Sequence, residues 1–117
     1  MLGNENEGLL AYFSEVAAAT IAGKIEWKRV NPTTFTWDTA SPAARVNFQR
    51  VNVVSASGAQ KVYLFQVFNM SQPAISVLAV RTDENPELAE KLAELYELVA
   101  SSVSQRSLDF MKQMLPK

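Results

Sequence analysis

The run KVYLFQVFN, from Lys61 to Asn69, carries apolar residues on both of its alternating faces. A strand at the centre of a sheet has this composition, because neighbouring elements cover it on both sides. We therefore predict that this run is the central strand of a sheet, and that the rest of the chain is organised around it.

Two shorter runs upstream indicate a hairpin. The run from Lys24 to Val30 alternates between apolar and charged residues, as a half-buried strand does. The segment Asn31-Pro32-Thr33 has the composition of a turn, and Phe35 and Trp37 then share one face of a second run. Because the two runs are so close in sequence, we predict an antiparallel pair.

Two further strands are expected on either side of the central run. We predict a third strand from Arg45 to Val54, a turn at residues 55–58 and a fifth strand from Ala74 to Arg81. The apolar residues of the third strand change parity part-way along it. One extra residue exchanges the two faces of a strand, so we expect a β-bulge near Gln49 and Arg50.

Helices are predicted at both ends of the chain. Apolar residues recur at three- and four-residue spacing from Asn4 to Ala22 and again from Pro86 onward. If it continued unbroken to Leu115, the second helix would be about 45 Å long, more than a domain of this size requires. Either it breaks near residues 101–107, where serines cluster, or its end packs on something beyond its own sheet.

These elements together predict an α+β fold in a single domain over residues 1–117: an N-terminal helix, an antiparallel meander of about five strands and a long C-terminal helix. The helices should cover one face of the sheet. The other face should be open or covered by a partner.

The expected layout resembles that of small bacterial helix–sheet–helix proteins that carry no assigned activity. The segments behind this resemblance are Gly23-Lys24-Ile25-Glu26-Trp27, after the first helix, and Leu95-Tyr96-Glu97-Leu98-Val99, in the last one. The resemblance implies a fold and no catalytic residues.

Composition argues against ordinary catalysis. The 117 residues include no histidine and no cysteine, the usual acid–base catalyst and the usual thiolate nucleophile, and both are common metal ligands. We therefore expect no catalytic residues, no metal site, no cofactor and no enzyme activity. The acidic start MLGNENEGLL is unlike a secretory signal, and no run is long enough to span a membrane, so we expect a cytoplasmic protein.

The net charge of −1 is a cancellation between two regions. Residues 24–81 hold seven basic residues against two acidic ones, whereas residues 82–100 hold six acidic residues against one lysine. If the basic residues of the strands share the open face of the sheet, they form a site for nucleic acid or another polyanion. The candidate contacts are Lys28, Arg45, Arg50 and Lys61.

Two further kinds of site are considered. The over-long last helix ends in apolar residues that suit adaptable contacts, so the leading expectation is a non-enzymatic interaction protein that forms a homodimer. The candidate contacts are Leu108, Phe110, Met111, Met114 and Leu115. A third interpretation places a small-molecule pocket between sheet and helices, lined by Trp27, Trp37 and Tyr96, although the same aromatics are also expected of an ordinary core.

Overall fold

The computed structural model describes residues 2–71 and 73–116, with side chains described from Asn6 onward. It has the predicted α+β fold, with two long helices and one five-stranded sheet. In chain order the elements are α1 (Leu2–Ile21), β1 (Lys28–Asn31), β2 (Thr34–Ala40), β3 (Ala43–Ser55), β4 (Gly58–Asn69), β5 (Ile75–Arg81), the 3-10 helix η1 (Pro86–Leu88) and α2 (Ala89–Gln113).

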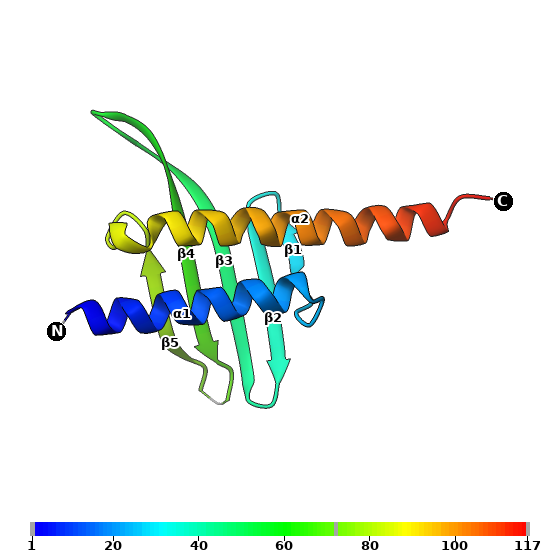
Figure 1. The fold of residues 1–117 in the computed structure, drawn as a ribbon, viewed down its shortest axis with the longest axis horizontal. Coiled ribbons are helices and arrows are strands. Elements are labelled where there is room, and N and C mark those ends of the chain that lie inside the picture. The colour runs from blue at the N-terminus through cyan, green and yellow to red at the C-terminus, as the bar shows by residue number, and fades with distance from the viewer. Residues whose placement is uncertain (1, 72, 117) are drawn as a thin grey trace.

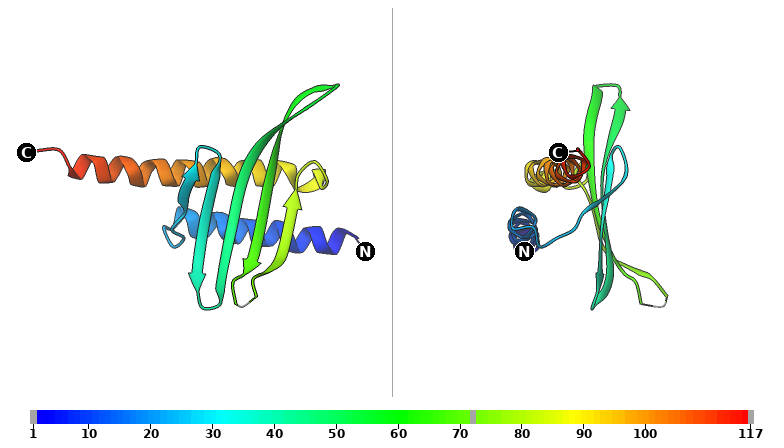
Figure 2. Two further views of the ribbon diagram at one scale, coloured as in Figure 1. Left: turned by 180° about the vertical axis from the view of Figure 1, so that it is seen from behind. Right: turned by 90° about the vertical axis from the view of Figure 1, so that its right-hand side faces the viewer.

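The sheet is a simple antiparallel meander in the order β1-β2-β3-β4-β5, as predicted. Both helices cross the same face of it, side by side and in the same direction, while the other face is left open (Figures 1 and 2). Their starts are linked by Asn6 of α1, which donates a hydrogen bond to Glu87 of η1. The sheet therefore has one helix-covered face, one open face and two free edges, β1 and β5.

Aromatic rings form the centre of the core. Phe35, Phe48 and Phe65 occupy directly paired positions on β2, β3 and β4, and each is almost completely buried. Phe13 of α1 and Tyr96 of α2 close over this row, with ring centroids 4.9 Å from Phe65 and 5.4 Å from Phe48. Edge-to-face contacts of this kind add to the burial of large apolar areas.

The first strand is shorter than predicted, because residues 24–27 form a loop and β1 begins only at Lys28. The apolar members of that loop, Ile25 and Trp27, are nonetheless buried. They insert into the core from the connection that descends from α1 to the sheet. The alternation read as a strand therefore reflects two anchoring side chains rather than ladder pairing.

The bulge predicted near Gln49 and Arg50 is wrong. β3 and β4 pair without interruption from Ala44↔Asn69 to Ser55↔Gly58. The parity of apolar residues changes because the hairpin extends past α2 and leaves the helix cover (Figure 1). Beyond Arg50 the apolar residues have the parity of the opposite face, and Val51 pairs there with Val62, which is itself fully buried.

The last helix does not break near residues 101–107. α2 is continuous from Ala89 to Gln113, and residues 101–104 lie within it. Val103 continues the buried stripe of this helix while Ser101 and Ser104 are exposed, so the serines occupy positions at which a helix tolerates them. Of the two alternatives considered for this segment, the continuous helix is the one observed.

Candidate interaction surfaces

α2 is too long for the sheet that it covers. Five strands spaced about 4.8 Å apart give a sheet about 20–25 Å wide. The 25 residues of α2 span about 37 Å. The helix crosses the strands and runs past β1, so its last turns project beyond the edge of the sheet (Figures 1 and 2). We call residues 104–115 the α2 overhang.

The overhang exposes apolar side chains. The five residues singled out from the sequence, Leu108, Phe110, Met111, Met114 and Leu115, are between 42% and 69% exposed. Phe110 lies seven residues, or two turns, beyond buried Val103. It therefore points in the same direction as the residues of α2 that pack on the sheet, but it lies past the edge of the sheet. Phe110 thus occupies a core-facing position of α2 beyond the edge of the sheet, and the other four residues extend the exposed apolar surface around it.

A groove of about 480 Å³ runs between the overhang and the β1 edge. Phe110 and Met111 line its helix side, and Lys28 and Arg29 line its strand side. Every residue of β1 is exposed. The apolar underside of the overhang therefore faces an open edge of the sheet rather than a closed interior.

The base of the overhang is anchored by Arg106. Its guanidinium donates a hydrogen bond to the backbone carbonyl of Trp27, and it lies 3.7 Å from the Glu26 carboxylate. The Trp27 indole N–H in turn donates to the hydroxyl of Thr20, at 3.1 Å. These contacts connect α2, the loop before β1 and the end of α1, so the overhang leaves the domain from a fixed base.

The four basic residues proposed as a polyanion contact do not share a face. On β2, Phe35 faces the helices, so Thr36 and Asp38 have the parity of the open face. Lys28 pairs with Thr36 and Arg45 pairs with Asp38, so both have the parity of the open face as well. Arg50 and Lys61 have the parity of the helix-covered face, in register with Tyr63 and Asn52. The expected basic face is therefore wrong, since the uninterrupted register of β3 places residues five apart on opposite faces.

Two of these basic residues also have acidic partners. Arg45 donates hydrogen bonds of 2.7 and 3.3 Å to Asp38, and these bonds hold the pKa of the Asp38 carboxyl below its usual value. Arg50 lies 3.8 Å from Glu97 and stacks over the ring of Tyr96, 5.2 Å from its centroid. Both arginines are thus engaged within the chain, which reduces the positive charge that they offer to a polyanion.

The aromatic trio proposed as a pocket is instead part of a packed interior. Trp27 and Tyr96 are almost fully buried, and the rings of Trp27 and Trp37 lie 5.6 Å apart. Trp27 also touches the groove beside β1, and Trp37 lines a separate shallow hollow against Tyr12 of α1. Of the trio, only Trp27 lines the first of these hollows and only Trp37 lines the second, so the three residues do not form the expected shared pocket.

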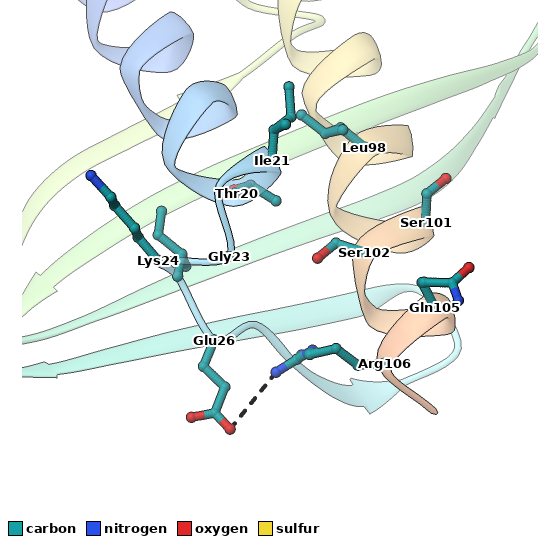
Figure 3. A pocket seen from close by; sticks show the side chains of 11 residues that line it. Thr20, Ile21, Gly23, Lys24, Glu26, Leu98, Ser101, Ser102, Gln105 and Arg106 are labelled. Carbon is teal, nitrogen blue, oxygen red and sulfur yellow. Dashed lines mark ion pairs between the residues drawn. The ribbon is translucent and has the colours of Figure 1, made fainter. Parts of the chain in front are cut away.

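The largest hollow described lies elsewhere, where α1 and α2 separate above the loop that leaves α1. It has a volume of about 780 Å³ and is open to solvent. Ile21 and Leu98 face it from the two helices, and Glu26 and Arg106 meet at its lower end (Figure 3). Among the described residues, no buried side-chain nitrogen or oxygen lacks a hydrogen-bond partner.

Within the described part of the chain, no three histidine, cysteine, aspartate or glutamate residues are placed to hold a metal ion. No helix of that part combines the length and the apolar character needed to cross a membrane. Comparison with known proteins finds no matching family model, no similar curated protein and no similar solved structure. The resemblance to small helix–sheet–helix proteins therefore stays an expectation.

One surface was missed by reasoning from the sequence: the free edge at β5. Ile75 and Val77 on this strand are 57% and 64% exposed. The signal was present, because no charged residue occurs between Met70 and Val80. The run was interpreted as an ordinary strand, although the predicted meander already places its fifth strand at an edge of the sheet.

Proposed function

We propose that this chain is a non-enzymatic interaction protein that acts as a homodimer, and that the α2 overhang holds the dimer together. The observation that carries the proposal is that α2 extends beyond the edge of the sheet and that its end exposes apolar side chains. In a twofold dimer the same patch serves both subunits, so one apolar overhang meets its own copy.

The area available matches this proposal. With side chains of this size, the five apolar residues of the overhang together expose roughly 500 Å². Two overhangs therefore supply roughly 1,000 Å² between them, about what a specific interface needs. Leu108 and Met111, three residues apart, lie on neighbouring turns of α2, which suits packing of one helix against another.

Light scattering coupled to size exclusion tests the proposal. We expect a species of twice the chain mass of 12.9 kDa at micromolar concentration. The double change Leu108→Glu and Leu115→Glu should yield monomers, because it places charges on the apolar patch. Val54→Glu is the matched control, since Val54 is 80% exposed at the tip of the β3–β4 hairpin and lies far from the overhang.

Two results would overturn the proposal. One is a monomer that persists at high micromolar concentration in the unmodified protein. The other is a dimer that survives the double change, because such a dimer would form through another surface. Circular dichroism of each variant separates loss of the dimer from loss of the fold.

A further inference from the structure

The two free edges of the sheet differ in how well they are protected. β1 has four residues, two of them Lys28 and Arg29, and is followed by Pro32. Short length, charge and proline are the usual means of keeping an edge strand from pairing with other chains. β5 has seven residues, and its only charged residue is Arg81 at its end. β5 is therefore the edge better able to accept another strand.

The side chains at this edge are also suited to a partner. Ile75 and Val77 are more than half exposed, and Val77 is the extra residue where the pairing between β4 and β5 shifts register. The residues from Leu78 to Arg81 return to regular pairing. The bulge at Val77 limits the regular part of the edge to Leu78–Arg81, so the edge offers backbone groups over these residues and apolar side chains just before them.

The helices extend beyond β5 on the covered face. The first turns of α1 and the segment around η1 reach past this strand (Figures 1 and 2). They are linked to each other, since Asn6 donates to Glu87 and Asn85 donates to Asn6. A strand added about 4.8 Å outside β5 would lie beneath these turns, so one of its faces would be covered from the outset.

Charge at this edge selects the orientation and chemistry of the added strand. Glu84 and Glu87 follow the C-terminal end of β5, and Asp83 there is already paired with Arg81 at 2.8 Å. In an antiparallel pair, the start of the added strand lies beside the end of β5. Basic residues that precede an alternating apolar run would therefore lie near Glu84 and Glu87, the second of which also accepts a hydrogen bond from Asn6.

We propose that the β5 edge binds an extended segment of a partner protein by antiparallel strand addition, and that this segment carries lysine or arginine before alternating apolar residues. Main-chain hydrogen bonds supply affinity in this mode of recognition, and alternate side chains supply specificity. The site lies at the opposite edge of the sheet from the α2 overhang. The two proposals therefore use different residues and stand separately.

Synthetic peptides test the site directly. The probe is a fluorescent ten-residue peptide with two lysines followed by alternating valine and threonine. Its controls replace the lysines with glutamates, or every second residue with proline. We expect the lysine peptide to bind more tightly than both controls, as followed by anisotropy. It should also slow amide hydrogen exchange over Ile75–Val80, because added pairing protects an exposed edge.

Variants locate the contact. Val77→Lys should weaken binding of the lysine peptide by at least about fivefold, because a charge on the edge opposes strand addition and repels the probe. Val54→Lys is the matched control and should leave binding unchanged, since this exposed valine lies at the hairpin tip. Urea unfolding of both variants shows that the fold is retained.

Three results would overturn the inference: equal binding of the lysine and glutamate peptides, slowed exchange at β1 instead of β5, or β5 exchange that slows with protein concentration alone. The last result would show that a second copy occupies the edge. Light scattering on the same samples separates this inference from the proposed homodimer. A monomer that binds the lysine peptide would refute the homodimer and leave strand addition at β5 supported.

Discussion

The hydrogen bond between Trp27 and Thr20 offers a sharp test of how the loop before β1 is held. The indole N–H donates to the Thr20 hydroxyl at 3.1 Å, and that hydroxyl donates to the carbonyl of Val16 at 2.8 Å. Thr20 and Trp27 are both almost fully buried. Thr20→Val keeps the volume and the β-branch, but leaves the indole N–H without an acceptor away from water.

A buried donor left unpaired costs about 1–3 kcal/mol. At the urea m-values usual for small domains, the unfolding midpoint should fall by about 0.5–1.5 M. Tryptophan fluorescence follows the transition. Thr20→Ser retains the acceptor and should lose about 1 kcal/mol or less, and Thr36→Val, on the open face, should change stability by less than about 0.5 kcal/mol. If Thr20→Val unfolds at the wild-type midpoint, the bond does not hold the loop.

Four other expectations follow from the packing, charges and backbone conformation described. Phe48→Ala should lower the free energy of unfolding by about 3–5 kcal/mol in urea titrations, because it empties the centre of the aromatic row. The hydrogen bond from Arg45 lowers the pKa of Asp38, and the stability that this contributes at neutral pH is lost as the pH falls through the folded-state pKa. Asp38→Asn should therefore flatten the acid side of a curve of unfolding free energy against pH. An unchanged acid side would show that Arg45 does not hold this carboxylate in solution. Burial raises the pKa of Tyr96. Its contribution to the free energy of unfolding is therefore complete below the unfolded-state pKa and is lost as the pH rises through the folded-state pKa. Tyr96→Phe should reduce the loss of stability at alkaline pH, measured by circular dichroism. Gly23→Ala should cost about 1 kcal/mol in thermal unfolding, because Gly23 has a φ of 74° after α1, and an unchanged melting temperature would contradict that reason.

The elements of the fold were predictable because their signals are local. The apolar stripe of α2 repeats at helical spacing over many turns, and the run from Lys61 to Asn69 is apolar on both faces. Both features depend on the period of one element alone. The length of α2 relative to a sheet of about five strands also pointed to its projecting end, which the structure leaves exposed.

The surfaces were harder to predict because they depend on how elements meet. Arg45 and Arg50 are five residues apart, so they share a face only if the strand contains a bulge between them. The parity change was interpreted as a bulge, and the basic face was a separate expectation that required these residues to share the open face. The actual cause of the parity change is that the β3–β4 hairpin leaves the cover of α2, and this depends on the placement of a helix distant in sequence.

The position of Trp37 and Tyr96 illustrates a related limit. Aromatic residues in neighbouring elements are compatible with either a cavity or a filled core, and composition does not distinguish them. The structure fills the space with Phe35 and Phe48, whose rings lie 5.4 Å from that of Tyr96. The volume left after packing depends on all the elements at once.

The side-by-side placement of α1 and α2 has a consequence for synthesis of the chain. The strands pair with their sequence neighbours, so the meander can assemble as it emerges from the ribosome. The contacts that close the domain join opposite ends of the chain: Asn6 bonds to Glu87, and Arg106 to the carbonyl of Trp27. The part of the apolar face that α2 covers therefore stays exposed until α2 has been translated, and a nascent chain that stalls before α2 presents that part to chaperones.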